Sequence, residues 1–341
     1  MIATPLEAPL VDRISAALPG LDVAFAPELL PLPRYPSDHR GVDGFVRDAA
    51  GEARWNRLLG EAEILYGVPG DSGPTLAAAV PRAPALRWIQ ATAAGAGEQI
   101  RAAQLAPADL ERIMFTSAAG VHGGMLAEFA FYGLLALRKD ARRLDRIRAE
   151  RSWEHFAMDE LDGSTIAVIG MGSIGAAVAQ RARAFGMHVI GVARTTQPHP
   201  AADEMVAVDA PGDAYRRAQT IVLTLPGTAA TRGLIDRATI ESWQPATVFI
   251  NVGRGAVVDQ AALTDALASG AIRGAVLDVF SPEPLPAGDP LWTLPNVIFS
   301  PHTAALSVRE NQRIVDLFCD NIRRFAAGGP LRNRVNVTEF Y

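Results

Sequence analysis

The most constraining feature of this sequence is a glycine-rich turn between an uncharged strand and a helical segment. Thr165–Ile169 is a charge-free run typical of a buried strand. It leads directly into a G-x-G-x-x-G pattern at Gly170, Gly172 and Gly175. The first glycine permits a tight turn, the second lets the backbone approach a pyrophosphate, and the third lets the helix pack close to the strand. With a helix N-terminus facing the phosphates, residues 165–194 are predicted to bind a dinucleotide.

Strands alternate with helices on both sides of this turn, which indicates an α/β fold with two doubly wound parallel sheets. A chain of 341 residues is also too long for one ordinary core. The first sheet is expected to contain the strands Asp22–Ala26, Ala62–Val68, Leu86–Thr92 and Arg112–Thr116. The second is expected to contain Thr165–Ile169, His188–Ala193, Met205–Val208, Thr220–Leu225, Thr247–Val252, Gly274–Val279 and Val297–Ser300. The second series matches a complete nucleotide-binding sheet.

Two long helical patterns accompany the strands. One starts near Val121, and its later part, Arg138–Arg151, is heavily charged. We interpret that part as a solvated helix end, with a partner-binding arm as the alternative. The segment Ser307–Ala327 is predicted to form a single amphipathic helix.

Composition excludes several classes of function. The net charge is −5 without a dense basic block, so neither nucleic acid nor a membrane surface is an expected partner. No apolar run approaches the length of a membrane span, and Met1–Leu10 lacks the layout of a signal peptide. A cytoplasmic location is therefore expected. Cys319 is the only cysteine and no two histidines have metal-ligand spacing, so we expect no metal.

The residues after the second strand of the nucleotide-binding series bear on the choice of cofactor. An NAD site places an acidic residue there against the ribose 2′-hydroxyl. This chain has Arg194, Thr195 and Thr196 instead. An arginine with two hydroxyls suits a 2′-phosphate, so NADP(H) is favoured over NAD(H). The alternative is that Arg194 stacks on the adenine of NAD.

Three candidate catalytic residues follow successive strands, at the end of the sheet where ligands bind in such folds. Arg254 follows the strand at 247–252, Glu283 follows that at 274–279, and His302 follows the last strand. Hydride transfer to a 2-oxo acid needs a carboxylate anchor and a proton donor, which arginine and histidine provide. A carboxylate beside the histidine would stabilise its protonated form and orient its ring.

Several motifs of the sequence resemble those of the D-isomer-specific 2-hydroxyacid dehydrogenase family, which includes glyoxylate/hydroxypyruvate reductases, phosphoglycerate dehydrogenases and formate dehydrogenases. The likeness covers most of the chain from Leu86 to Ala305. Besides the glycine turn, the motifs are Leu86–Gly95, Gly120–His122, Ala127–Phe129, Asn251–Gly255, Leu277–Pro284 and Pro301–Ala304.

The resemblance implies that Arg254 anchors the substrate, that His302 is the acid/base, and that Glu283 pairs with His302. Backbone N–H groups of Ala94 and Gly95 would bind the substrate carboxylate, and Asp278 would contact the nicotinamide amide. The remaining cofactor contacts would come from Ser173, Ile174, Leu225, Pro226, Thr231, Val252 and Ala304, together with the glycines and Arg194–Thr195. The sequence departs from the family at Leu225, where a histidine or similar polar residue often precedes the proline.

The resemblance also implies a discontinuous arrangement. A Rossmann coenzyme domain, residues 120–305, would be inserted into a flavodoxin-like substrate domain formed by residues 1–119 and 306–341. A homodimer joined through the coenzyme domain is expected, with a small 2-oxo or 2-hydroxy acid as substrate. We expect a 2-oxo acid reductase, such as a glyoxylate/hydroxypyruvate reductase. The alternatives are a dinucleotide-sensing, corepressor-like binding protein of the same fold and an enzyme acting on formate or phosphite.

Overall fold

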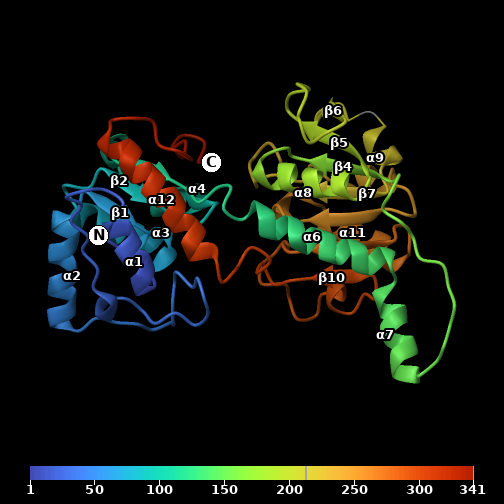
Figure 1. Ribbon diagram of the computed structural model, residues 1–341, viewed down its shortest axis with the longest axis horizontal. Helices are drawn as coiled ribbons and strands as arrows, with labels where there is room; N and C mark the ends of the chain where they lie inside the picture. The colour runs from blue at the N-terminus through green and yellow to red at the C-terminus, as the bar shows by residue number, and fades with distance from the viewer. Residues whose placement is uncertain (212, 341) are drawn as a thin grey trace. The chain divides into compact units, whose positions relative to one another are not determined.

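The computed structural model describes residues 1–340 except residue 212, and these form two compact units (Figure 1). Unit 1 comprises Met1–His122 and Leu306–Tyr341, and unit 2 comprises Gly123–Ala305. The chain thus first passes from unit 1 to unit 2 after His122, and not after residue 119 as predicted. The physical reason is that His122 bonds to Glu310, which belongs to the returning part of unit 1.

Unit 1 is built on a small parallel sheet in the order β1-β2-β3. Its strands are β1 (Ile64–Tyr66), β2 (Trp88–Gln90) and β3 (Met114–Thr116). Single bridges extend the sheet at both edges, parallel between Ile2 and Tyr66 and antiparallel between Thr116 and Arg334. The prediction of a strand at residues 22–26 is wrong for the described chain. That segment meets the edge through one backbone bond, from the Ile2 N–H to the Ala24 carbonyl.

Alternation along each short strand divides unit 1 into two layers. Leu65, Ile89 and Phe115 pack on one face, against α2 (Ala49–Glu61), α3 (Gly73–Ala79) and α4 (Ala96–Ala103). Tyr66 and Trp88 pack on the other face, against α1 (Ala8–Ser15) and α12 (Glu310–Ala326). The remaining helical segments are η1 (Pro27–Leu29), η2 (Pro69–Asp71), η3 (Val80–Arg82) and α5 (Pro107–Arg112). The predicted C-terminal helix is confirmed, starting a few residues later than expected.

Unit 2 contains a fully parallel sheet in the order β10-β9-β8-β7-β4-β5-β6. The strands are β4 (Thr165–Ile169), β5 (His188–Ala193), β6 (Glu204–Ala207), β7 (Thr220–Leu223), β8 (Val248–Asn251), β9 (Gly274–Leu277) and β10 (Val297–Phe299). All seven predicted strands are present, within two residues at each end. The strand order reverses between β4 and β7, and such switch points are where ligands bind in open α/β sheets.

Apolar residues cover both faces of the unit 2 sheet, as expected for parallel strands. Along β4, Ile166 and Val168 face α6 (Gly123–Arg138) and α8 (Ser173–Ala184) (Figure 1). Ala167 and Ile169 face the opposite layer. That layer includes α9 (Ala214–Arg217), α10 (Arg237–Glu241), α11 (Gln260–Ala268), η4 (Gly255–Val257) and η5 (Pro290–Trp292).

The long helix expected after Val121 is two helices. After α6 ends, Asp140 takes up the left-handed conformation with φ of 52°, and its side chain accepts a hydrogen bond from the Arg143 N–H. This cap starts α7 (Ala141–Glu150), which extends away from the sheet of unit 2 (Figure 1). None of its ten residues is buried. Among the helices of the described chain, none combines the length and apolar character needed to cross a bilayer.

Candidate active site

The turn after β4 has the geometry that its three glycines require. Gly170 has φ of 99°, and a Cβ there would lie 2.7 Å from the Thr224 hydroxyl oxygen. A Cβ on Gly175 would lie 1.8 Å from the Gly170 carbonyl oxygen, so only glycine permits this packing of helix on strand. Gly172, by contrast, would point a Cβ into space that contains no described atom within 4 Å. The first and third glycines are therefore needed by the fold, whereas the second leaves room for a ligand.

The start of α8 fits a bound pyrophosphate. Gly172 occupies the N-cap position, and no described side chain caps the helix, so the N–H groups of its first turn, including Ser173 and Ile174, remain available to an anion. The Thr224 hydroxyl donates to the Gly170 carbonyl at 2.7 Å, which fixes the turn against the end of β7. The cradle thus lies at the switch point of the sheet, and its shape and donors suit the diphosphate of a dinucleotide.

The other predicted cofactor residues lie at the ends of nearby strands. Arg194 and Thr195 directly follow β5 and are exposed. After β7, the Thr231 hydroxyl donates to the Pro226 carbonyl at 2.6 Å and accepts from the Thr228 N–H at 2.8 Å. The structure therefore gives Thr231 a local role in shaping the loop after β7. The other predicted residues of this group, all half-buried or buried, are Leu225, Val252 and Ala304.

Arg254 stands on a tightly packed loop after β8. The Asn251 side chain forms this loop by accepting from the Gly253 N–H at 3.0 Å and donating to the Arg254 carbonyl at 3.2 Å. A Cβ on Gly253 would lie 2.6 Å from the Leu225 carbonyl oxygen, and one on Gly255 would lie within 1.9 Å of the Phe280 carbonyl oxygen. Glycine is therefore required at both positions because the chain's own backbone, rather than a ligand, occupies the space where a side chain would lie.

His302 and Glu283 form a direct pair. The His302 Nδ1 lies 2.8 Å from Glu283 Oε2, while Glu283 Oε1 accepts from the Phe280 N–H at 2.9 Å. His302 has φ of 57°, a left-handed conformation that costs energy for a non-glycine residue. With Nδ1 directed at the carboxylate, Nε2 is the ring atom left to exchange a proton with a substrate. The side chains are 45% and 37% exposed, so this pair is accessible.

Asp278 organises the loop that carries His302. Its Oδ1 accepts from the Ala304 N–H at 3.0 Å and from the Ser300 hydroxyl, and its carbonyl accepts from the His302 N–H at 3.0 Å. Asp278 is buried, and in the structure its carboxylate satisfies a backbone N–H and a hydroxyl of this loop. The contact of Asp278 with the nicotinamide amide stays a prediction.

Several residues that shape the site were not identified from the sequence. Asn251 and Ser300 act through the loops described above, and Gln260 on α11 accepts from the Ser281 N–H at 2.8 Å. Only Asn251 carried a signal, because it lies at a strand end inside the quoted motif with Arg254. The other two act through contacts between residues distant in sequence, Ser300 with Asp278 and Gln260 with Ser281, which form only in the folded chain.

These loops meet at one edge of the sheet. Arg254, Glu283 and His302 follow β8, β9 and β10, which are consecutive parallel neighbours. Gly255 presses on the backbone of Phe280, Phe280 bonds to Glu283, and Glu283 bonds to His302. A guanidinium, a carboxylate and an imidazole are thus carried by loops in continuous contact at one edge of the sheet.

Ala94 and Gly95 lie in unit 1, at the carboxyl end of β2. Gly95 is the N-cap of α4 and no described side chain caps this helix. The Ala93 carbonyl accepts from the Ala118 N–H at 3.0 Å, which fixes the start of the turn. Their backbone N–H groups therefore have the setting expected of carboxylate donors.

Comparison with known proteins agrees with this geometry. The model of the family "D-isomer specific 2-hydroxyacid dehydrogenase, NAD binding domain" matches residues 131–304. A D-3-phosphoglycerate dehydrogenase of Mycobacterium bovis is 32% identical over 301 residues, covering 82% of this chain and 56% of that protein. The glyoxylate reductase of Korarchaeum cryptofilum is 34% identical over 66% of this chain and 69% of that protein.

Among solved structures, a D-isomer specific 2-hydroxyacid dehydrogenase from Xanthobacter autotrophicus Py2, in complex with NADPH and MES, is 28% identical. The match covers 97% of this chain and 95% of that one, with a TM-score of 0.74. The chain belongs to the D-isomer specific 2-hydroxyacid dehydrogenase family. It is an enzyme of the NAD(P)-dependent oxidoreductase class, with a Rossmann coenzyme domain in unit 2. Among the described residues, no group of three or more His, Cys, Asp or Glu is placed to hold a metal.

Proposed function

We propose that this chain reduces a small 2-oxo acid, such as glyoxylate or hydroxypyruvate, and prefers NADPH to NADH. The observation that carries the proposal is the His302–Glu283 pair, at 2.8 Å, on the loop system that also presents Arg254. A protein that only binds a dinucleotide has no need of a histidine held by a carboxylate on loops that also carry an arginine. The glyoxylate reductase among the relatives supports the substrate class.

Each of the three side chains, Arg254, His302 and Glu283, has its own role in the proposed reaction. A nicotinamide cofactor bound in unit 2 would supply the hydride. The Arg254 guanidinium binds the substrate carboxylate, with the backbone N–H groups of Ala94 and Gly95 as further donors. His302 delivers the proton on Nε2 to the carbonyl oxygen as negative charge develops there. Glu283 accepts from Nδ1, which orients the ring and stabilises the imidazolium that donates the proton.

The preference for NADPH rests on the end of β5. An exposed arginine and threonine, Arg194 and Thr195, stand where an NAD site has an acidic residue. An exposed guanidinium is free to reach a 2′-phosphate, and its charge favours the phosphorylated ribose. The NADPH held by the Xanthobacter relative supports this preference.

The decisive test is the initial rate of NADPH oxidation with a panel of 2-oxo acids, for the wild-type chain and His302→Ala. We expect turnover by the wild type and a fall of about 10²–10⁴-fold in the variant, the usual contribution of a general acid. Full turnover in the variant would remove His302 from the mechanism. No turnover on any acid, combined with dinucleotide-dependent assembly, would favour the sensing protein instead.

The cofactor preference has a separate test. Arg194→Asp places a carboxylate where a 2′-phosphate would bind and restores the acid that an NAD site uses. We expect kcat/KM for NADPH to fall by at least tenfold while that for NADH holds or rises. Unchanged values for both cofactors would contradict the assignment of Arg194.

We also propose a homodimer joined through unit 2. None of the ten residues of α7 is buried, and an isolated helix of this length is marginal in water. Leu144 on this helix and Trp153 just after it are 38% and 92% exposed. A second copy of the chain would cover this apolar surface. The molar mass in solution, measured by light scattering, tests the proposal.

A further inference from the structure

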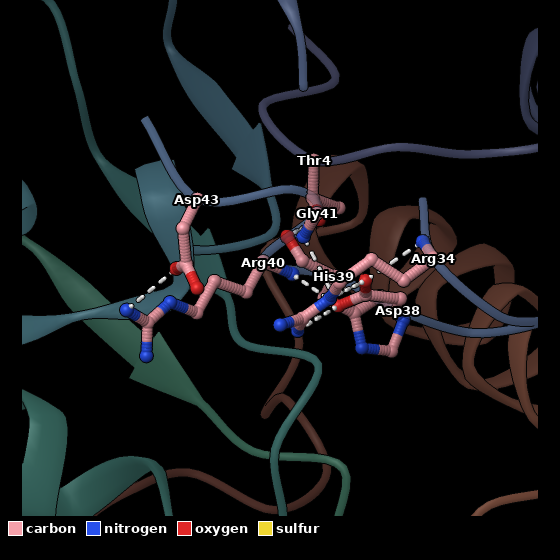
Figure 2. A network of polar contacts seen from close by, with 7 residues as sticks. All are labelled: Thr4, Arg34, Asp38, His39, Arg40, Gly41 and Asp43. Atoms are coloured by element: carbon pink, nitrogen blue, oxygen red, sulfur yellow. Dashed lines mark hydrogen bonds and ion pairs between the residues drawn. The ribbon is translucent and has the colours of Figure 1, made fainter. Parts of the chain in front are cut away.

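One buried carboxylate holds together an irregular segment of unit 1 between η1 and α2 (Figure 2). Asp38 accepts from Arg34 Nε at 2.7 Å, from the Arg34 N–H at 2.9 Å and from the Gly41 N–H at 3.0 Å. Burial opposes the charged form of Asp38, but the hydrogen bonds from Arg34 and Gly41 outweigh it and lower its pKa well below the ordinary value. The segment is therefore fixed although it contains no regular structure.

The next residue anchors the same segment to the body of unit 1. His39 Nε2 lies 2.8 Å from the Asn311 side-chain oxygen at the start of α12, and the Thr4 hydroxyl donates to the His39 carbonyl at 2.8 Å. Arg40 follows, and its side chain extends away from Asp38 toward Asp43, 3.1 Å away (Figure 2). The anchored backbone thus places the Arg40 guanidinium on a defined side of the segment.

On that side lies a cavity of about 320 Å³ that the mechanism does not use. The fixed segment, α2 and α3 form its walls, and their apolar contribution includes Leu30, Pro31, Trp55, Leu59 and Ala79. This volume lies at the lower end of the range for small-molecule sites. Ala94 and Gly95 are not among the described residues that line it.

The cavity carries more positive than negative charge. Its described lining residues include Arg40, Arg47 and Arg82 but only two acids, Asp43 and Glu52. Arg40 is paired with Asp43. Glu52 pairs with both other arginines. Its Oε1 lies 2.8 Å from Arg82 Nη1, and its Oε2 lies 3.6 Å from Arg47 Nη1. Two guanidinium groups therefore share one carboxylate in a cavity whose lining is both polar and apolar.

Arg47 shows the effect of this arrangement. Its guanidinium lies over the Trp55 ring at 3.9 Å, and its side chain is only 20% exposed. Burial lowers the pKa of Arg47, and the shared Glu52 offsets this only in part. An anion placed between Arg47 and Arg82 would supply a second counter-charge for the two guanidinium groups, most effectively for the half-buried Arg47.

We propose that this cavity binds a small organic monoanion, a carboxylic acid whose carboxylate lies between Arg47 and Arg82 and whose apolar body packs toward Trp55. The guanidinium fork matches a carboxylate, and the ring and aliphatic walls match an apolar body of a few carbon atoms. A single negative charge equals the excess of arginine over acid in the lining. The site is a binding site additional to Arg254 and does not depend on the proposed function.

The experiment is a calorimetric titration of the full chain with benzoate, with benzamide as the uncharged counterpart. It is run on the wild type and on Arg254→Gln, so that binding at the predicted substrate anchor is recognised separately. We expect benzoate to bind Arg254→Gln and benzamide not to bind. Adding Arg82→Gln should weaken benzoate about tenfold, the value of one lost charged hydrogen bond. Glu52→Gln should tighten it several-fold, because it removes the competing carboxylate.

Arg57→Gln is the matched control, because Arg57 is an exposed residue of the same helix α2 and is not among the described residues lining the cavity. It makes the same change in net charge and should leave benzoate affinity unchanged. Thermal unfolding confirms that each variant is folded. The assignment is overturned by equal benzoate affinities of Arg254→Gln with and without Arg82→Gln, by equal weakening when Arg57→Gln is added instead, or by no benzoate binding to Arg254→Gln.

Discussion

At the scale of single residues, the site depends on which atom of His302 faces which partner. Glu283 uses both carboxylate oxygens, one for the Phe280 N–H and one for His302 Nδ1. The first bond ties the carboxylate to the end of β9, so the second holds the ring at a fixed angle. The left-handed backbone of His302 adds to this, since a strained residue is kept only where its surroundings determine it. Orientation of the imidazole is thus built into the backbone as well as into the pair.

Glu283→Gln tests this arrangement directly. The amide oxygen would keep the bond from the Phe280 N–H, so the NH2 group would face His302 Nδ1 and could not accept its proton. The imidazolium would lose its stabilising partner, and we expect kcat for 2-oxo acid reduction to fall about 10²-fold or more with little change in fold. Steady-state rates and circular dichroism measure both effects. A variant within threefold of the wild type would argue that the pair serves only the local structure.

At the scale of elements, strands and glycine positions were predictable, and contacts between loops were not. The β4 and β5 boundaries follow from uncharged β-branched runs that end at a glycine turn or an arginine. The break between α6 and α7 was missed because Asp140 acts through a local left-handed cap, which a periodicity argument does not register. The segment at 22–26 has strand-like composition, but only its edge contact with Ile2 could decide the outcome. The role of Asp38 could not be predicted from the sequence, because its hydrogen-bond donors, Arg34 and Gly41, come together only in the folded segment.

The Asp38 segment makes a prediction about pH. A carboxyl whose pKa is lowered on folding contributes stability that is complete above its unfolded value, about 3.9, and that is lost as pH falls through the folded value. Asp38→Asn should therefore reduce the free energy of unfolding by about 2 kcal/mol at pH 7. The difference from the wild type should stay constant down to about pH 5 and narrow below pH 4. Urea unfolding of both proteins across this range measures it, and a gap that widens on acidification would refute the explanation.

At the scale of the whole molecule, each unit has its own apolar core on both faces of its own sheet. The dinucleotide cradle at Gly170–Gly175 belongs entirely to unit 2. Binding there stabilises the unit that holds it, by about 2.7 kcal/mol at a hundredfold excess over Kd.

NADPH should therefore slow hydrogen exchange mainly in the sheet of unit 2. Peptides that contain β4, β7 and β8 are expected to gain protection, while those that contain β1–β3 change little. Mass spectrometry of the exchanged full chain, with and without NADPH, gives the comparison, and Gly175→Ala provides a variant with a disrupted turn. Equal protection of both sheets in the wild type would show that the cofactor couples the two cores.

Unit 1 is formed by two parts of the chain that flank unit 2 in the sequence, and this has a consequence for synthesis. Trp88 stacks on Phe318 and Phe325, with ring centroids 5.1 and 5.5 Å apart, and both phenylalanines belong to α12. A ribosome exposes Trp88 long before it makes α12, and all of unit 2 is translated in between. We expect Trp88 in the nascent first part of unit 1 to stay exposed until α12 is synthesised. Chaperones are therefore expected to bind this part of the chain until the last helix emerges.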